Sequence, residues 1–526
     1  MSEAPKKPGR RRNARAAKLA ERQAPLADAM RPVVPGLAGG RFRPLNDAEQ
    51  VQINDAVLEV LETVGLANAI PSCVERVVQA GGSLTESGRL LFPRALVEDT
   101  LANCQREVLL AGRDERHDLH IGGDRVYFGT AGAAVHIVDI DNNNYRDSTL
   151  LDLYDLARLV DQMDNIHFFQ RSVVARDMVS NRDLDINSLY ACLQGTQKHI
   201  GVSFTEPHLV REGLDMCYRV AGSEGAYRER PFVSQSNCFV VPPLRFAEDA
   251  CACLEEAVLG GMPVLLLSAG QAGATSPASL AGSVVQSVSE CLAGLVYVNL
   301  IQKGAPAVFG TWPFVSDLRT GAMTGGSGEQ AILSAAVAQM GRWYKLPTGT
   351  AAGMSDAKLP DAQSGYEKGT AVALAGHSGA NMVYESCGMH GSLMGACFES
   401  MVIDNDMLGA INRTVRGVEV NEQTLGLEAI REVTSGVQHY LGTSHTMSLM
   451  ENHYLYPTVG DRSSPKEWAE RGKPSLIEQS QKKLKSLMAS HYPNYVGAQL
   501  DAELRADFEI KLDPEQMEVS SRWSTE

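Results

Sequence analysis

Residues 262–312 read MPVLLLSAGQAGATSPASLAGSVVQSVSECLAGLVYVNLIQKGAPAVFGTW, and the order of segments within them points to the fold. A short apolar run from Met262 is followed by a glycine-rich turn, a long apolar segment over 279–304 and a second β-rich run from Ala305. A strand, a helix and a strand in this order form a βαβ unit, whose right-handed crossover places the two strands parallel to each other. We therefore predict an α/β protein.

The same alternation continues in both directions along the chain. Eight β-rich runs, separated by helical segments, start about 30 to 43 residues apart: RVYFGTA from Arg125, HFFQRSVV from His167, KHIGVSFT from Lys198, PFVSQSNCFVV from Pro231, MPVLLLSAG from Met262, APAVFGTW from Ala305, LPTGTAAG from Leu346 and ANMVYESCG from Ala380. Eight such units in about 260 residues are typical of a closed (β/α)8 TIM barrel. A doubly wound open sheet is the alternative.

The rest of the chain is divided around this barrel, which we assign to residues 121–400. Residues 1–40 are predicted to be a basic flexible arm, because Met1–Arg31 carries nine Lys or Arg and three acidic residues. The arm is a solvated tail or packs on a partner subunit, and binding to an anionic surface or RNA is the alternative. Residues 41–120 are predicted to be an N-terminal α-rich extension, and residues 401–526 a C-terminal helical cap.

Composition excludes several classes of protein. The 526 residues are 44% hydrophobic and carry a net charge of -15, which leaves an acidic body that does not favour nucleic acid. No apolar run reaches the roughly 18 to 20 residues of a membrane helix, and no apolar signal region is present. The ten cysteines lack C-x-x-C spacing. We therefore expect a cytoplasmic homo-oligomer with reduced thiols and no tightly bound metal.

Active sites of such barrels lie at the C-terminal ends of the strands, and the sixth unit places large aromatic residues there. Trp312 and Phe314 follow its strand, and Asp317 and Arg319 come next. Aromatic faces attract a cationic ligand by roughly 0.5 to 2 kcal/mol each. A hydrophobic lid over the barrel is the alternative interpretation.

Polar residues gather after three other strands. The seventh unit has Asp356, Lys358, Tyr366 and Glu367 within twelve residues, a set that can bind a cation, a carboxylate or both. In the eighth unit, Tyr384, Glu385 and His390 lie near the mouth of the barrel, whereas Cys387 is favoured as an inert buried thiol. In the fifth, Thr275 precedes a helix whose amides attract an anion, or it simply caps that helix.

Three blocks together resemble the trimethylamine methyltransferase family: GATSPASLAG; GTWPFVSDLRTGAMTGGSGEQAILSAAVAQMGRWYKLP with SDAKLPDAQSGYEK; and YLGTSHTMSLMENHYLYP followed by Asp461 and Arg462. The resemblance covers about residues 45–510 and implies a (β/α)8 barrel. It also implies transfer of a methyl group from a methylated amine to Co(I) of a corrinoid, or cobalamin, on a separate small protein. Founding members carry pyrrolysine in a loop at the mouth, near Lys358 here, and this chain has none.

The missing pyrrolysine points to a quaternary amine, with glycine betaine favoured over proline betaine, carnitine and choline derivatives. A quaternary ammonium already carries its charge and leaves as a neutral tertiary amine. We expect an ammonium cage and an anchor for the substrate carboxylate. The catalytic candidates are Asp356, Glu367 and Glu385; the substrate-binding candidates are Trp312, Phe314, Tyr366 and Tyr384, with Phe204 and His390 as additions, and Arg319, Lys358 and the amides near Thr275 for the carboxylate.

Three alternatives remain open at this point. The first is a trimethylamine:corrinoid methyltransferase, and the second is a non-catalytic betaine-binding protein. The third is a different barrel enzyme, such as a metal-dependent hydrolase or an aldolase. A missing His-x-His cluster argues against the hydrolase.

Overall fold

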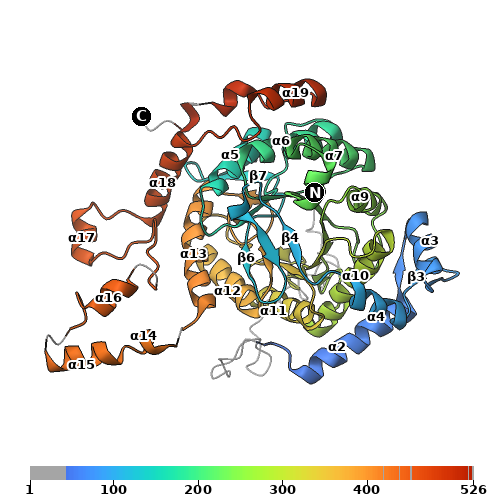
Figure 1. The fold of residues 1–526 in the computed structure, drawn as a ribbon, viewed down its shortest axis with the longest axis horizontal. Coiled ribbons are helices and arrows are strands. Elements are labelled where there is room, and N and C mark those ends of the chain that lie inside the picture. The colour runs from blue at the N-terminus through green and yellow to red at the C-terminus, as the bar shows by residue number, and fades with distance from the viewer. Residues whose placement is uncertain (1–42, 419, 437–438, 451–452, 519–520, 524–526) are drawn as a thin grey trace, which may run out of the picture.

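Eight parallel strands close into a barrel at the centre of the molecule (Figure 1). The computed structural model describes residues 43–526 except 419, 437–438, 451–452, 519–520 and 524–526, so the predicted basic arm at 1–40 lies outside the described residues. In their order around the ring, the strands are β6 (Tyr127–Phe128), β18 (Met382–Tyr384), β17 (Thr348–Ala351), β14 (Ala307–Thr311), β12 (Val264–Ser268), β11 (Val233–Asn237), β10 (His199–Val202) and β9 (Phe168–Gln170). A parallel bridge between Gly129 and Phe168 closes the ring. Each of the eight predicted runs contains one of these strands, which confirms the barrel.

A ring of helices covers the outside of the barrel (Figure 1). They are α5 (Leu150–Asp161), α6 (Asn181–Gly195), α7 (Pro207–Ala221), α9 (Glu248–Leu259), α10 (Leu280–Ile301), α11 (Gly328–Trp343), α12 (Ala362–Ser378) and α13 (Phe398–Arg416), with the short α8 (Glu224–Glu229) after α7. Among the described residues, only α10 is long and apolar enough to cross a membrane by composition, and 78% of its most apolar window is buried inside the protein. It packs between the barrel strands β12 and β14 and the N-terminal part of the chain.

The barrel interior is filled by side chains and closed at one end by a hairpin. Strands β4 (Val108–Leu110) and β5 (Leu119–Ile121) pair antiparallel, and their apolar side chains join those of the barrel lumen in one cluster. The Ala111 amide bonds to the Pro231 carbonyl, and the Arg113 amide bonds to the Gln197 carbonyl. Because Gln197 and Pro231 precede β10 and β11, the hairpin closes the N-terminal end of the barrel and leaves the C-terminal end for a site.

The N-terminal extension packs against α10. It contains α2 (Asp47–Glu59), β1 (Leu66–Ala67), α3 (Pro71–Gln79), β2 (Ser83–Leu84), β3 (Arg89–Leu91) and α4 (Arg94–Asn103), and its helices contact α10. The first helix begins with a capping box, in which Asn46 and Glu49 satisfy each other's backbone amides. This region covers the side of the barrel at α10.

The C-terminal helices run along the side of the barrel rather than over its end. They are α14 (Glu422–Leu425), α15 (Leu427–Ser435), α16 (Ser444–Leu449), α17 (Pro465–Glu470), α18 (Leu476–Ser490) and α19 (Ala498–Phe508). Helix α18 packs against α13 and α5, where buried Arg158 donates to the carbonyls of Met488 and His491. The predicted boundary at residue 400 falls inside α13, the eighth helix of the barrel, and α14–α17 extend away from the body (Figure 1).

Replacing Gly349 by alanine is expected to lower the free energy of unfolding by about 1–3 kcal/mol. A Cβ at this position in β17 would lie 2.7 Å from Cε2 of Tyr384, whose ring fills the lumen. Urea unfolding followed by tryptophan fluorescence measures the change.

Gly369→Ala is the matched control, because a Cβ at this position in α12 meets no atom within 4 Å. Alanine in a helix should leave the stability unchanged or raise it by up to about 1 kcal/mol. Equal stability of G349A and the wild type would contradict the close packing of the lumen.

Candidate active site

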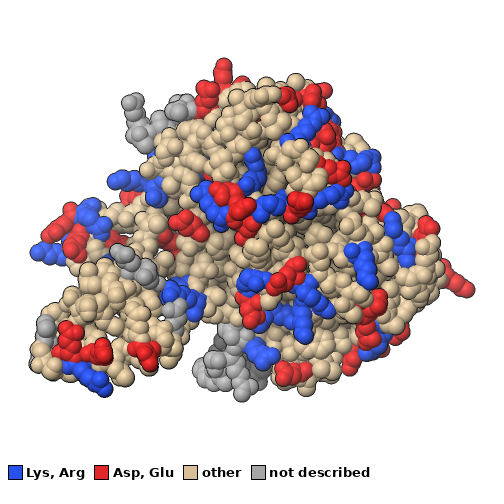
Figure 2. Space-filling view, viewed as in Figure 1, with Lys and Arg blue, Asp and Glu red and all other residues tan. Residues whose placement is uncertain are grey.

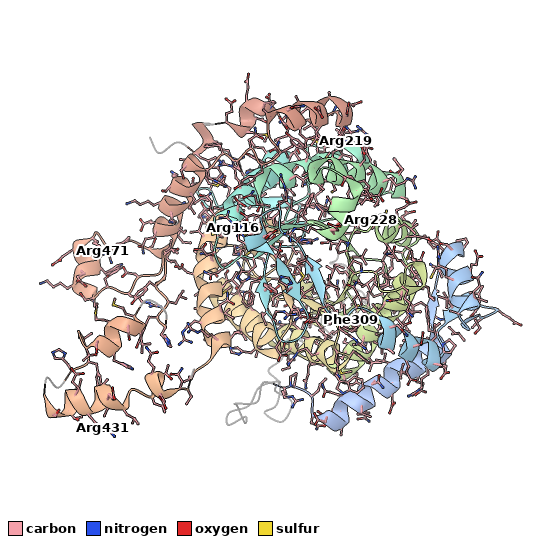
Figure 3. All side chains as sticks on the ribbon, in the orientation of Figure 1. Arg116, Arg219, Arg228, Phe309, Arg431 and Arg471 are labelled. Carbon is pink, nitrogen blue, oxygen red and sulfur yellow. The ribbon has the colours of Figure 1, made fainter. Side chains whose placement is uncertain are left out.

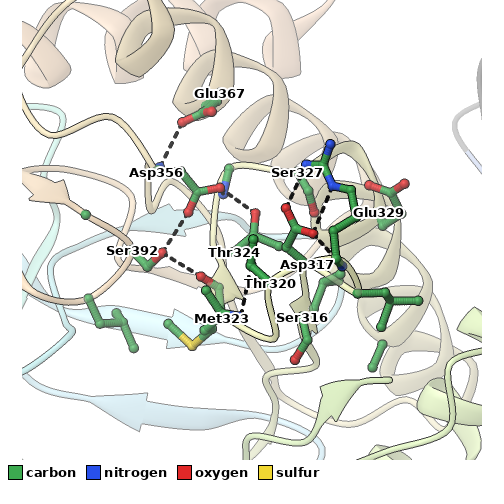
Figure 4. Close-up of a pocket in the computed structure, with 18 of the residues that line it drawn as sticks. Ser316, Asp317, Thr320, Met323, Thr324, Ser327, Glu329, Asp356, Glu367 and Ser392 are labelled. Atoms are coloured by element: carbon green, nitrogen blue, oxygen red, sulfur yellow. Dashed lines mark hydrogen bonds and ion pairs between the residues drawn. The ribbon is translucent and has the colours of Figure 1, made fainter. Parts of the chain in front are cut away.

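Loops after the barrel strands form a cavity of about 1180 Å³ at the mouth (Figure 4). A small sheet of β13 (Gln271–Ala272), β15 (Phe314–Ser316) and β16 (Met323–Thr324) forms one wall. On the opposite side, β19 (Met389–His390) and β20 (Gly395–Ala396) pair with β7 (His136–Asp139) and β8 (Asn144–Asp147). Charged side chains that line the cavity are Asp317, Arg319, Glu329, Asp356, Lys358 and Glu367.

Asp356 connects two loops of this mouth. One carboxylate oxygen accepts hydrogen bonds from the Thr324 hydroxyl and the Gly326 amide. The other accepts from the Gly325 amide at 2.9 Å and the Ser392 hydroxyl at 2.7 Å (Figure 4). Partial burial acts to raise the pKa of Asp356, but these hydrogen bonds outweigh it and hold the pKa below its ordinary value. The carboxylate is therefore ionised at neutral pH and its lone pairs are occupied.

Glu367, on α12, is held in the same way. Its carboxylate accepts from the Ser355 hydroxyl at 2.6 Å, from the Asp356 amide at 2.9 Å and from Gln363 at 2.8 Å. A Cβ on Gly326 would lie 2.3 Å from the Glu367 carboxyl, so the turn fits against it only because residue 326 is glycine. The structure thus brings together two predicted catalytic carboxylates and uses both to shape the mouth.

Beneath this cavity, aromatic rings span the barrel lumen. The Tyr384 ring lies 5.1 Å from the Trp312 ring and 5.0 Å from the Phe168 ring, measured between centroids. Phe314 belongs to the same apolar cluster, and Met323, which lines the cavity above, packs against it. Three of the predicted aromatic residues therefore meet at the floor of the mouth.

Glu385, the residue after Tyr384, carries a carboxyl group without a partner. Its side chain is buried, and neither carboxyl oxygen has a hydrogen-bond partner. Burial raises the pKa of Glu385 to about 8. Buried polar groups are nearly always paired, because leaving one unpaired costs the full penalty of removing it from water. An unpaired carboxyl at a barrel mouth is a candidate for contact with a ligand.

The influence of Glu385 on the pKa of Cys238 and the backbone conformation of Glu385 both favour a side chain directed toward the lumen. Cys238, which follows β11, has a thiol pKa raised to about 11, first by burial and also by the Glu385 carboxylate. Strands β11 and β18 lie on opposite sides of the ring, so groups at their ends influence each other only across the lumen. Glu385 also has a φ of 57°, which breaks the alternation of side chains after Tyr384.

The residues predicted to hold a substrate carboxylate lie elsewhere on the mouth or away from it. Arg319 is exposed and pairs with Asp317 at 2.7 Å. The Lys358 ammonium donates to the Asp356 carbonyl at 2.6 Å on the rim of the cavity. Thr275 accepts from the Gln271 amide within its own turn, four residues before the cap of α10. None of these groups reaches the aromatic floor through a contact in the described residues.

Three further candidates are separated from the lumen. Tyr366 is 64% exposed on α12. Phe204 is buried in the outer layer, where its ring lies against Gly213 of α7. His390 is buried against Ser400, and burial together with Lys368 lowers the pKa of the imidazole to about 2, so that it is neutral. We therefore expect residues other than these three to bind the substrate.

Sequence reasoning missed Phe168, Cys238, Thr324 and Ser392 as parts of this region. Phe168 was visible as an aromatic residue in a predicted strand, and its inward direction follows from the alternation of that strand. Thr324 and Ser392 meet Asp356 from loops that are far apart in the sequence. No local pattern signals such contacts.

The described residues contain no group of three or more His, Cys, Asp or Glu side chains placed to hold a metal ion. What the floor offers is one buried carboxyl and several aromatic faces. Both attract an organic cation.

Comparisons with known proteins agree with one another. The chain matches the trimethylamine methyltransferase (MTTB) family over residues 10–513. It is 30% identical over 480 residues to trimethylamine methyltransferase MttB of Desulfitobacterium hafniense strain DCB-2, covering 91% of this chain and 95% of the relative. A glycine betaine methyltransferase of strain Y51 is 26% identical over 467 residues, 89% and 96% of the two chains. Trimethylamine methyltransferase MttB1 of Methanosarcina mazei is 30% identical over 484 residues, 91% and 96%.

Glu385 is expected to make the wild-type protein less stable as the pH rises. Between its ordinary pKa of 4.5 and its folded pKa of about 8, the folded state holds a proton that the unfolded chain has lost. Glu385→Gln removes this difference and should be more stable than the wild type at pH 8, by on the order of a few kcal/mol. Urea unfolding between pH 4.5 and 8.5 measures both curves.

Asp356→Asn should change the pH dependence of stability in the opposite direction to Glu385→Gln. Since the folded pKa of Asp356 is depressed, its contribution is present at neutral pH and is lost as the pH falls below about 4. This variant should be destabilised at pH 7 and approach the wild type in acid.

Parallel curves for E385Q and the wild type would show that Glu385 is not a buried, unpaired acid.

Proposed function

The chain belongs to the trimethylamine methyltransferase family, and we propose that it removes a methyl group from glycine betaine and passes it to a corrinoid on a partner protein. The unpaired Glu385 carboxyl, on the residue that follows the lumen aromatic Tyr384, is the observation that carries this proposal. The likeness to a glycine betaine methyltransferase supports the same substrate. The site is thus a binding site for a small organic cation at the barrel mouth.

The floor of the mouth matches both ends of glycine betaine. Its trimethylammonium group fits against the faces of Trp312 and Tyr384, with the ionised Glu385 nearby. Its carboxylate supplies an acceptor for the Trp312 Nε1–H, which is a buried donor without a partner. A ligand that satisfies both unpaired groups binds better than one that satisfies only the carboxyl, because each unpaired group costs free energy.

Methyl transfer from a quaternary ammonium depends on the orientation of the substrate more than on proton transfer. The corrinoid, when bound, supplies a Co(I) nucleophile that accepts the methyl group. The chain's own residues hold the ammonium at the floor of the mouth and keep one methyl group directed toward the opening. Because the leaving group departs as a neutral tertiary amine, no acid is needed to protonate it. Asp356 and Glu367 contribute by fixing the loops through which the partner approaches.

Trimethylamine is the second candidate substrate, since two of the relatives described above carry its name. Its protonated form has an N–H that Glu385 can accept. It has no group for the Trp312 donor, and this difference separates the two candidates.

Glycine betaine is expected to bind with release of a proton at pH 7. The Glu385 carboxyl is mostly protonated in the free protein and must ionise beside the ammonium, so affinity should rise with pH until about 8. Calorimetry in buffers of different ionisation enthalpy measures both quantities. E385Q should bind at least about tenfold more weakly, without proton release.

Glu290→Gln is the control, because this buried carboxyl lies on α10 and already bonds to Ser268 and Gln286. It should leave the proton release unchanged. Betaine binding to the wild type with no proton released would remove Glu385 from the site.

Turnover is tested with free cobalamin reduced to Co(I). Methylcobalamin and dimethylglycine should form from glycine betaine faster than methylcobalamin forms from trimethylamine. Trp312→Phe keeps the ring and loses the N–H, so its KM for glycine betaine should rise about tenfold, while its KM for trimethylamine should stay the same.

Reaction of trimethylamine alone would reject glycine betaine in favour of the second candidate. Tight betaine binding with no methyl transfer, even with a competent corrinoid protein, would support a binding protein in place of an enzyme for this substrate.

A further inference from the structure

Gln170, the last residue of β9, carries an amide group that is buried without a partner among the described residues. Only 6% of the surface of Gln170 is exposed. Its backbone carbonyl accepts from the Thr130 hydroxyl, but its side chain makes no hydrogen bond within the described part of the chain. Buried polar groups are nearly always paired, so an amide in this state is a candidate for contact with a ligand.

The alternation of side chains along β9 directs this amide into the lumen. Phe168 belongs to the apolar cluster of the lumen, whereas Phe169 belongs to the larger cluster outside the barrel wall. Gln170 therefore shares the lumen face with Phe168. It lies about 6 to 7 Å further along the strand, toward the mouth. The Gln170 amide is thus placed above the aromatic floor that Phe168 helps to form.

Gly201 of the neighbouring strand β10 indicates the same direction and shows how the amide is turned. Gly201 pairs with Gln170, and both neighbours of Gly201, Ile200 and Val202, belong to the outer cluster. A Cβ on Gly201 would therefore point into the lumen, where it would overlap Oε1 of Gln170 and lie 3.2 Å from Nε2. The amide oxygen thus lies against β10, and the NH2 group with its two donor hydrogens is turned away from that strand.

Gln170 joins Trp312 and Glu385 as a buried group without a partner near the C-terminal end of the lumen. Strand β9, which ends at Gln170, lies opposite β14, which Trp312 follows, so the two donors approach the lumen from opposite sides. The set comprises one carboxyl that lacks a cation and two donors that lack an acceptor. A molecule with one ammonium and one carboxylate, whose two oxygens accept from both donors, would satisfy all three groups.

We propose that Gln170 donates to the carboxylate of the substrate and is the residue by which this protein selects methylated amines that carry one. This role rests on the proposed function, which places the substrate ammonium at the aromatic floor. A neutral amide attracts a carboxylate without repelling the ammonium beside it, whereas an arginine or lysine at this position would repel that ammonium. Trimethylamine has no carboxylate and would leave the Gln170 donors unpaired.

The substrate reaches Gln170 from the C-terminal end of the barrel, because the β4–β5 hairpin closes the other end. Figure 3 shows Arg116, in the turn between β4 and β5, within the ring of barrel helices, as expected for a hairpin that covers one end. Acidic and basic side chains of the described residues are intermixed on the face of the molecule in Figure 2. The charge of that face favours neither an anionic nor a cationic substrate, which leaves selection to the lumen.

Two ligands that share an ammonium group test the proposal. Glycine betaine carries a carboxylate and tetramethylammonium does not, and calorimetry on the full chain gives the Kd of each. The wild type should bind glycine betaine at least about tenfold more tightly than tetramethylammonium. Gln170→Met has a similar length and no donor, so it should lower this preference about tenfold or more, by weakening the binding of glycine betaine alone.

Gln170→Glu keeps the shape of the side chain and replaces its donors by a carboxylate. Glycine betaine should bind to Q170E more weakly than to Q170M, because two carboxylates then face each other. Tetramethylammonium should bind as tightly as it does to the wild type, or more tightly. A loss of folding would weaken both ligands, so opposite responses separate recognition from a structural effect, and thermal unfolding checks the fold.

Gln235→Met is the matched control. Gln235 is a buried glutamine of β11 whose amide atoms also lack partners among the described residues. It pairs with Val202 and Val264, which belong to the outer cluster, so its side chain faces away from the lumen. This variant should keep the wild-type Kd for both ligands.

Equal affinity of the wild type for the two ligands, or binding of neither, would overturn the proposal. A full preference for glycine betaine in Q170M would overturn it as well. Methyl transfer to reduced cobalamin decides the proposed function separately. A wild type that prefers glycine betaine but does not transfer its methyl group would reject the proposed function, and the responses of Q170M and Q170E would still decide the role of Gln170.

Discussion

Closure of eight short parallel strands into a ring determines the rest of this structure. Each strand contributes only two to five residues, yet every one has a hydrogen-bonded neighbour on both sides. Because the strands are parallel, their C-terminal ends meet at one end of the ring, and the loops that follow them converge there. The β4–β5 hairpin closes the opposite end. The barrel therefore has one open end, at the C-terminal ends of its strands.

A ring of eight strands encloses a lumen only wide enough for side chains, and this limits what the floor of the mouth contains. Phe168, Tyr384 and Trp312 fill it, and glycine at position 349 leaves room for the Tyr384 ring. Glu385 follows Tyr384, and burial of its carboxyl without a partner destabilises the folded state. Such a group is understandable where a bound cation supplies the missing partner, so stability is reduced at the place where binding is needed.

Much of this architecture was accessible from the sequence, but only part of the site was. Trp312, Phe314, Tyr384 and Glu385 were selected because they follow predicted strands, and the structure gathers them at one floor. Arg319 and Tyr366 were selected for their chemistry, and they point to the solvent. Asp356 and Glu367 lie at the mouth as expected, although their oxygens are occupied by loop donors. Sequence position predicts proximity to the mouth and does not predict the partner of each group.

The sequence alone determined the repeated βα units, their parallel order and the end of the barrel at which chemistry takes place, because hydrophobic period and strand spacing are local properties of the chain. The tertiary structure decided which side chains enter the lumen. The left-handed backbone at Glu385 breaks the alternation of β18, and only closure of the ring brings the end of β18 opposite the end of β11. The helical segment after α13 was likewise readable, but its projection from the barrel depends on contacts that no single stretch of sequence contains.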